Sequence, residues 1–212
     1  SGLPIEALNV FVPPHHPVVG PERNDEALQV YVTTAMGRMQ ELGAALVVFG
    51  SGGARSTPPG FDVQRVPGQL LDFLRMAGDI ASNHGMDLVI EPLWREKCDT
   101  INTVLEGYVA ALESGHPHVW TLADWYHVFH NDEPLSNLSD SAPRLRHIHV
   151  PVPPIADKPE QPTDAGFDAF LETLLSTGYD QRVSVEDNGN RFSDFDTEAR
   201  QALAYLRDRI GH

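Results

Sequence analysis

The sequence predicts an α/β fold of parallel strands with outer helices, of the (β/α)8-barrel type. Short runs rich in β-branched residues alternate with longer segments of helical periodicity, which is the pattern of repeated βα units. Several of the short runs end on a side chain that can bind metal or transfer a proton. A chain of 212 residues with 41% hydrophobic content can bury one core, so we expect residues 1–212 to form a single domain.

The first half of the chain holds the first three expected strands. They cover residues 5–12, 45–50 and 87–91, and expected helices over 24–42 and about 67–84 separate them. Gly43 and Gly85 follow the two helices as C-terminal signals. Helical spacing turns one apolar face of each helix inward. The expected inward residues are Leu28, Val32, Ala35, Met39 and Leu42 in the first helix, and Leu70, Leu74, Ala77 and Ala81 in the second.

The second half continues the alternation. We expect strands over 119–124, 146–150 and 182–186, and helices over 101–114, 164–177 and 195–210. The expected inward residues of the 101–114 helix are Val104, Leu105, Tyr108 and Leu112. A polar stretch precedes the 146–150 strand, and the prolines of 151–164 predict a loop over the strand ends.

The strand count has a consequence for assembly. About six βα units are visible, whereas a closed barrel of this type has eight and typically needs about 250 residues. The first visible strand begins close to Ser1, so the shortfall lies at the N-terminus. An open six-stranded sheet would expose two unpaired edges. We therefore expect either that a partner chain covers them, as in a homo-oligomer, or that the chain is a fragment.

Four expected strands end on chemically active side chains, namely Glu91, Asp124, His149 and Glu186. In a parallel barrel the carboxyl ends of the strands meet on one face. Two glutamates, an aspartate and a histidine there indicate a metal site with two carboxylates placed for proton transfer. For Asp124 alone, capping of the following helix is an equally good explanation. His147 is expected to be a structural, buried histidine that faces away from His149.

Five segments resemble successive strand-end motifs of the xylose-isomerase-like TIM barrels, a family that includes hydroxypyruvate isomerases and ketose 3-epimerases. They occur in the family's order and are VVFGSGGAR at 47–55, IEPLWREKCDTINTV at 90–104, LADWYH at 122–127, LRHIHV at 145–150 and GYDQRVSVE at 178–186. Compared with the whole family barrel, the chain starts at the third strand. This agrees with the count of strands.

The resemblance implies that Glu91, Asp124, His149 and Glu186 ligate one divalent ion, with Mn²⁺, Mg²⁺ or Co²⁺ favoured and Zn²⁺ a further candidate. Three carboxylates and one imidazole suit such an ion better than the sulfur-rich sets of structural zinc. The implied reaction is isomerisation or epimerisation of a small sugar or hydroxy-keto acid through an enediolate. Glu91 and Glu186 are the implied proton-transferring pair.

Four further residues are candidates for substrate contact. His127 resembles the family's ligand for a substrate hydroxyl. Arg55 is expected to hold either a substrate or a neighbouring carboxylate, and Trp94 to wall an apolar side of the pocket or to pack structurally. The family's arginine near the 151–164 loop has no counterpart, and Lys158 is the nearest cation. Asparagine is usual in the family where Trp94 stands. These departures from the family pattern, at Trp94 and at the missing arginine, therefore lie among the expected substrate contacts and not among the four expected metal ligands.

Two alternative functions stay open beside the isomerase or epimerase. A dehydratase can share the same proton abstraction and then expel a hydroxyl. A non-catalytic relative that binds sugar or metal is the other alternative, and the missing arginine favours it. An endonuclease of the related abasic-site type ranks last, because it needs more metal ligands and a basic groove.

Composition narrows the range of partners. The 15 basic and 30 acidic residues give a formal charge of -15, which repels nucleic acid and anionic membrane surfaces. Cys98 is the only cysteine and cannot form an internal disulfide, and no apolar stretch approaches the roughly 20 residues that span a bilayer. We expect a cytoplasmic protein that acts on a small carbohydrate-like molecule.

Overall fold

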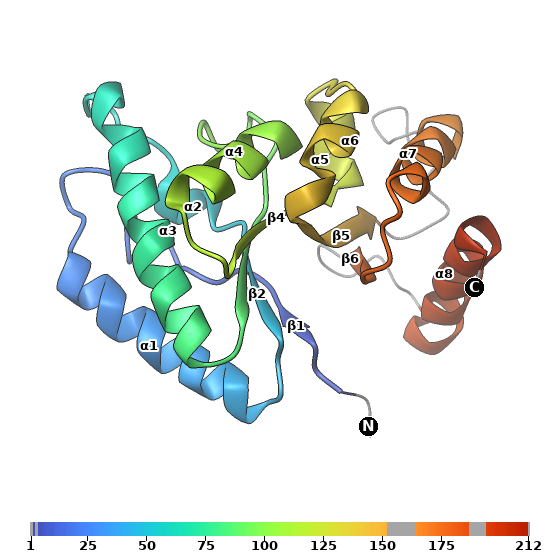
Figure 1. The fold of residues 1–212 in the computed structure, drawn as a ribbon, viewed down its shortest axis with the longest axis horizontal. Helices are drawn as coiled ribbons and strands as arrows, with labels where there is room; N and C mark the ends of the chain where they lie inside the picture. Colours follow the sequence, from blue (N-terminus) through green and yellow to red (C-terminus); the bar gives the residue numbers. More distant parts are fainter. Residues whose placement is uncertain (1, 3, 152–163, 187–193, 212) are drawn as a thin grey trace.

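The sheet consists of six parallel strands that pair in chain order (Figure 1). A computed structural model describes residues 2, 4–151, 164–186 and 194–211. The strands in these ranges are β1 (Ala7–Leu8), β2 (Leu46–Phe49), β3 (Asp87–Ile90), β4 (Val119–Asp124), β5 (Leu145–Pro151) and β6 (Val183–Glu186). The expected six-stranded α/β arrangement of TIM-barrel type is confirmed.

Helices follow the strands and form an arc on the outer side of the sheet (Figure 1). The longer ones are α1 (Asp25–Glu41), α3 (Val66–Asn83), α4 (Val104–Ser114), α7 (Asp164–Ser176) and α8 (Phe195–Ile210). The shorter ones are α2 (Gly52–Arg55), α5 (Trp125–His130) and α6 (Ser136–Ser141), with single 3-10 turns at Val63–Arg65 and Ala142–Arg144. None of the helices in the described ranges has the length and apolar character of a membrane span.

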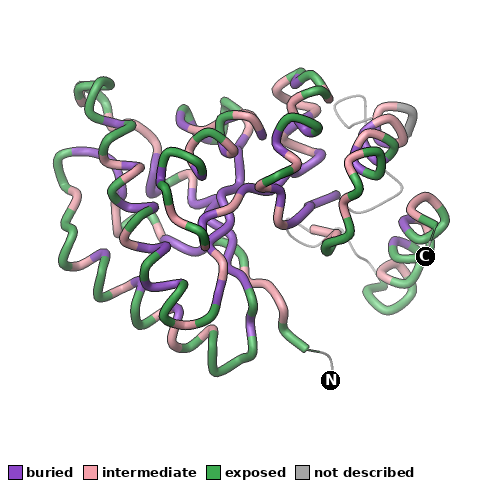
Figure 2. The backbone as a smooth tube through the Cα atoms, in the orientation of Figure 1, coloured by how far each residue is buried: buried purple, intermediate pink, exposed green. Residues whose placement is uncertain are grey.

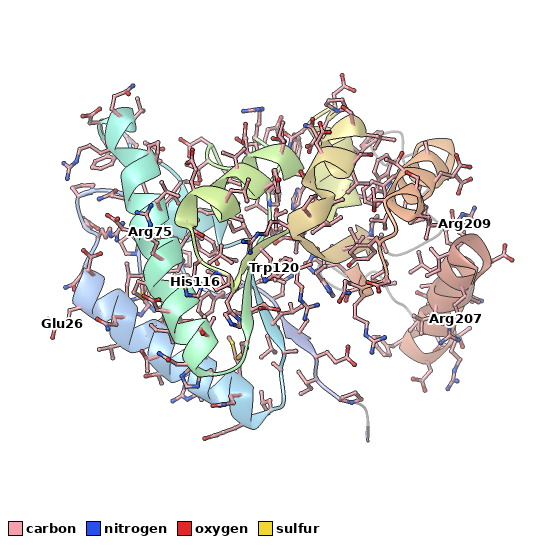
Figure 3. All side chains as sticks on the ribbon, viewed as in Figure 1. Glu26, Arg75, His116, Trp120, Arg207 and Arg209 are labelled. Carbon is pink, nitrogen blue, oxygen red and sulfur yellow. The ribbon has the colours of Figure 1, made fainter. Side chains whose placement is uncertain are left out.

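Side-chain bonds join neighbouring helices. Arg75 of α3 donates to the carbonyls of Glu113 and Ser114 at 3.0 and 3.3 Å, where the last carbonyls of α4 lack helical partners (Figure 3). Arg209 of α8 donates to Asp168 of α7 at 2.7 Å (Figure 3). These contacts join α3 to α4 and α7 to α8 on the outer side of the sheet.

The four central strands, β2 to β5, are mostly buried, which explains their nearly continuous apolar sequence, whereas β1 and β6 are only partly buried (Figure 2). Val47 and Phe49 of β2 face the helices and belong to the larger outer core. Leu46 and Val48 alternate with them and pack against Val89 and Leu122 on the inner side. A second outer core lies under α5, α7 and α8. Because successive side chains of a strand point to opposite faces, this alternation determines which residues at the strand ends point into the barrel.

Several expected elements differ in detail. The strand expected over 5–12 pairs only at Ala7–Leu8. The inward face of the 67–84 helix is confirmed, since all four expected residues are buried. Leu42 and Leu112, also expected inward, are 54% and 46% exposed. In α1 the buried set instead includes Met36, and in α4 it runs through Gly107 and Ala111.

The polar stretch before β5 contains α5 and α6, which the sequence did not predict. Asp124 starts α5 by accepting the Tyr126 backbone N–H at 2.7 Å. The helix is short and rich in aromatic residues, so it lacks an apolar period long enough to recognise.

The two ends of the sheet approach one another. Arg182, just before β6, donates to both carboxylate oxygens of Glu6, just before β1, at 2.7 and 3.0 Å. The sheet therefore curls into a half-barrel, and side chains bridge its first and last strands.

Candidate metal centre

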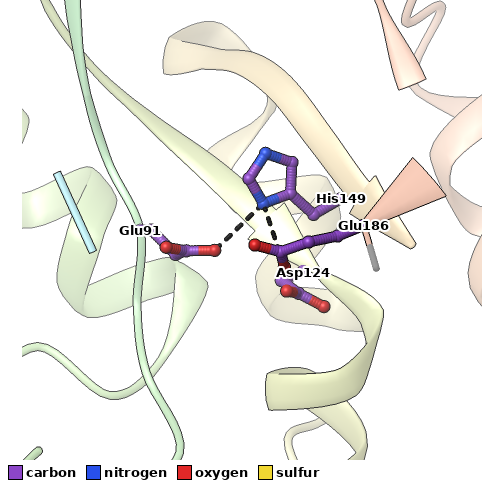
Figure 4. Close-up of side chains that lie close together, drawn as sticks. All are labelled: Glu91, Asp124, His149 and Glu186. Carbon is purple, nitrogen blue, oxygen red and sulfur yellow. Dashed lines mark hydrogen bonds and ion pairs between the residues drawn. The ribbon is translucent and has the colours of Figure 1, made fainter. Parts of the chain in front are cut away.

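The four strand-end residues meet at the carboxyl edge of the sheet (Figure 4). Glu91 follows β3, Asp124 ends β4, His149 lies in β5 and Glu186 ends β6. Parallel pairing places Asp124 directly opposite His149 and Glu186 opposite Pro151. One ligand atom from each of the four side chains lies within 4.8 Å of the others. The sequence prediction that these residues converge agrees with this geometry.

The cluster is strongly acidic and enclosed. The side chains of Glu91, Asp124 and His149 are 6%, 3% and 5% exposed, and that of Glu186 is 21% exposed. Nδ1 of His149 lies 3.0 Å from Glu91 Oε1 and 3.6 Å from Glu186 Oε2. The cluster therefore contains three carboxylates and one basic group, the imidazole of His149.

The protonation equilibria reflect this crowding. Burial, followed by the charge of Glu91, raises the pKa of Asp124 well above its ordinary value and also raises the pKa of Glu186. Burial alone would lower the pKa of His149, but the hydrogen bond and charge of Glu91, with the other carboxylates, raise it to about 9. The cluster thus favours positive charge at its centre.

The residues fit a divalent cation. Buried carboxylates are costly unless a cation or hydrogen bonds compensate them, and here they face one another. Carboxylate oxygens with a single imidazole nitrogen are donors that suit Mg²⁺, Mn²⁺ and other hard or borderline ions. One oxygen of Asp124 caps α5, and the same carboxylate also belongs to the cluster.

Gly50 and Arg55 support the position of Glu91. A Cβ on Gly50 would lie 2.1 Å from Glu91 Oε2, so the glycine leaves room for this carboxylate. Arg55 is completely buried and donates to the carbonyls of Gly50 and Glu91, each at 2.7 Å, and to the carbonyl of Thr100. Arg55 therefore ties the ends of β2 and β3 together and has no exposed atom with which to reach a substrate.

His127 faces the open side of the cluster. Its Nδ1 accepts the Trp94 backbone N–H at 3.1 Å, and its Nε2 lies 4.0 Å from Asp124 Oδ2. Burial lowers the pKa of His127 to about 4, so the ring is neutral near pH 7. Because Nδ1 accepts, Nε2 carries the proton and is free to donate toward the cleft.

The other two expected substrate residues are placed differently. The Trp94 ring stacks on His130 with centroids 4.5 Å apart and meets Tyr126 edge-on, so it packs beside the cleft. Lys158 lies outside the described residues. His147 was expected to face away from His149, and this is wrong, because residues two apart on a strand share a face. Their rings are 5.2 Å apart, and His147 is buried and bonds Ser184.

A cleft of about 610 Å³ opens above the cluster. Its walls include Lys97, one of the departures from the family pattern, and residues that the sequence did not single out, namely Asn9, Val10, Val12, Pro14, Leu93 and Tyr126. Asn9 and Val12 follow β1 in the structure, but both lie inside the strand expected over 5–12, so no signal in the sequence indicated that they reach the site. Lys97 comes from the segment after β3, where the sequence already departs from the family pattern.

Comparisons with known proteins agree with this fold. A family model described as xylose isomerase-like TIM barrel matches residues 2–209. The curated protein 3-dehydro-D-guloside 4-epimerase of Escherichia coli (strain K12) is 30% identical over 140 residues. The match covers 64% of this chain and 51% of that protein, so it spans about half the length of the relative.

Two solved structures show the same arrangement of elements. D-psicose 3-epimerase with D-tagatose from Clostridium cellulolyticum H10 has a TM-score of 0.82 at 17% identity, over 99% of this chain and 79% of that one. The IOLI protein with a bound zinc atom has a TM-score of 0.72 at 18% identity, over 97% of this chain and 76% of that one. At such identities the likeness concerns the fold. Together with the family match, these findings establish that the chain belongs to the xylose isomerase-like TIM barrel family.

Proposed function

We propose that this protein is a metal-dependent epimerase or isomerase of a keto sugar, with Glu91 and Glu186 as its proton-transferring groups. The observation that carries the proposal is the order of the cluster along the sheet. Glutamate, aspartate, histidine and glutamate stand on four neighbouring strands, from β3 to β6. The two glutamates therefore flank the site from its two ends, as a reaction with one base and one acid requires.

The chemistry divides between the ion and the side chains. A divalent ion held by the four residues would polarise a substrate carbonyl and its neighbouring hydroxyl. One glutamate removes the proton from the carbon beside the carbonyl, and the other returns a proton to that carbon from the opposite side. Inversion of configuration at that carbon follows. His127, neutral with a proton on Nε2, donates to a substrate hydroxyl.

The relatives suggest which sugars to test. The names 3-dehydro-D-guloside 4-epimerase and D-psicose 3-epimerase describe enzymes that invert a carbon next to a ketone. That position is where a hydrogen is acidic enough for a carboxylate to remove. We therefore propose 2-ketoses and 3-keto glycosides as the first substrates, with a hydroxy-keto acid as a further candidate.

Metal binding and proton exchange test the proposal together. Metal-stripped wild type is titrated with Mn²⁺ beside Glu186→Gln and His149→Ala, with Glu172→Gln on the exposed face of α7 as the matched control. We expect about one ion in the wild type and the control and poor binding in the two site variants. Full occupancy in both site variants would refute this ligand set.

The same proteins are then incubated with the keto sugars in deuterated water. We expect metal-dependent exchange of the hydrogen beside the ketone in the wild type and its loss in Glu186→Gln. Loss of water from the sugar would favour the dehydratase instead. Metal binding without exchange on any of these ketones would favour a non-catalytic sugar-binding protein.

A further inference from the structure

Glu186 is the most exposed member of the cluster, and its carboxylate accepts a hydrogen bond from a residue that follows the first strand of the sheet. Glu186 ends β6, the last strand in the order of the sheet, and its side chain is 21% exposed. Asp124 is fixed by the α5 backbone and Glu91 by the His149 ring and the space at Gly50. From the strands beside it, Glu186 is approached by His149 Nδ1, 3.6 Å from Oε2, and by a side-chain hydrogen bond with Asp124.

Asn9 adds a further hydrogen bond to the Glu186 carboxylate, from across the gap between the first and last strands. Its Nδ2 donates to Glu186 Oε1 at 2.5 Å, although the two residues are 177 positions apart in sequence. Asn9 follows β1 directly, at the same edge of the half-barrel as the cluster. This bond occupies one oxygen of the carboxylate and leaves Oε2 directed toward His149 at 3.6 Å.

The Asn9 amide is itself held in one orientation. Its Oδ1 accepts the Val10 backbone N–H at 2.8 Å, so Nδ2 is the atom turned to Glu186. Val10 has a φ of 53°, a conformation that a β-branched residue rarely adopts without constraint. The turn after β1 is therefore arranged so that a donor, and not an acceptor, meets the carboxylate.

Charge explains why an amide suits this position. The cluster already contains three carboxylates, two of which have raised pKa values because of burial and the charge of Glu91. A carboxylate at position 9 would add like charge beside Glu186. An amide provides a hydrogen bond without changing the charge of the site.

We propose that Asn9 is a positioning residue that orients the Glu186 carboxylate for metal binding and proton transfer. The inference rests on the proposed function, because it assigns Glu186 the role given there. Asn9 acts through Glu186, by the hydrogen bond that its Nδ2 donates to Glu186 Oε1.

The same gap offers a matched control. The Glu6–Arg182 pair also bridges the first and last strands, at 2.7 Å, but it does not touch the cluster. Glu6→Gln therefore weakens the bridge without disturbing Glu186. Asn83→Ala, at the exposed end of α3, controls for the loss of an asparagine elsewhere.

The experiment measures Mn²⁺ affinity of metal-stripped Asn9→Ala and Asn9→Leu by calorimetry, and the visible spectrum of the Co²⁺-loaded proteins. We expect about tenfold weaker Mn²⁺ binding in both Asn9 variants, the size typical when a residue that orients a ligand is lost. We also expect a changed Co²⁺ spectrum, because the coordination geometry alters. Both controls should bind like the wild type, and thermal unfolding should show all variants folded.

Each of the other possible outcomes overturns a stated part of the reasoning. If the Asn9 variants bind Mn²⁺ like Asn83→Ala, with an unchanged Co²⁺ spectrum, the positioning role is overturned while the proposed function stands. If Glu6→Gln weakens binding equally, Asn9 acts by holding the strands together and the inference fails. If the wild type itself binds neither ion, the proposed function and the inference fall together.

Discussion

Substitution of Gly50 by alanine tests directly whether Glu91 needs its observed position. Gly50 has an ordinary backbone conformation, so alanine introduces no backbone strain there. Its Cβ would lie 2.1 Å from Glu91 Oε2, and real Cβ atoms essentially never come closer than 3.0 Å to another heavy atom. The carboxylate oxygen must therefore move by about 1 Å, on the order of the misplacement that costs about 100-fold in a catalytic site.

We expect Gly50→Ala to fold but to bind Mn²⁺ about 10 to 100-fold more weakly, since a ligand is displaced without being removed. Titration calorimetry on metal-stripped protein measures the affinity, and thermal unfolding measures the fold. Gly68→Ala in α3 is the matched control, because nothing lies within 4 Å of its added Cβ. The control should bind Mn²⁺ normally and gain up to about 1 kcal/mol of stability. Unchanged affinity in Gly50→Ala would refute a fixed, metal-binding Glu91.

Two further predictions concern stability and pH. Arg55→Met leaves the buried carbonyls of Gly50, Glu91 and Thr100 without their donor, so we expect a loss of about 3 kcal/mol or more and a Tm lower by about 6 to 12 °C. A Tm within 2 °C of wild type in scanning calorimetry would contradict this reasoning. The raised pKa of His149, about 9, means that a proton occupies the metal-free site at pH 7 and that metal must displace it. Mn²⁺ affinity should therefore rise up to about tenfold per pH unit from pH 6 toward 9, and an affinity independent of pH would exclude this coupling.

The convergence of Glu91, Asp124, His149 and Glu186 could be predicted from sequence because it depends on local rules. Each of these residues stands at or near the carboxyl end of an apolar strand, and parallel strands bring those ends together. The pattern needs no knowledge of contacts between distant segments. This is why the sequence alone brings Glu91 and Glu186 together, although nearly half of the chain separates them.

The role of Arg55 could not be predicted in the same way. A basic residue just after a strand has the same sequence pattern whether it reaches a substrate or turns inward to the main chain. Its environment is decided by Thr100, 45 residues away, and by the carbonyl that Glu91 presents after β3. Leu42 and Leu112 show a related limit, because helical period identifies an apolar stripe but not which edge of it the sheet covers.

The cluster and its supports differ in what they contribute to the site. The four proposed ligands stand on consecutive strands from β3 to β6, so the register of those strands fixes their spacing. The residues contributed after β1 and β2, Asn9 and Gly50, carry no charge, and each acts on one of the flanking glutamates. Changes among the ligands therefore alter the charge available to a cation, whereas changes at Asn9 or Gly50 alter only the direction of a carboxylate. Proton transfer depends on that direction more steeply than metal binding does, because the carboxylate must reach one carbon of the substrate. Substitutions at these two positions should consequently reduce turnover more than metal affinity. Such variants would distinguish the proton-transfer role of each glutamate from its metal-binding role.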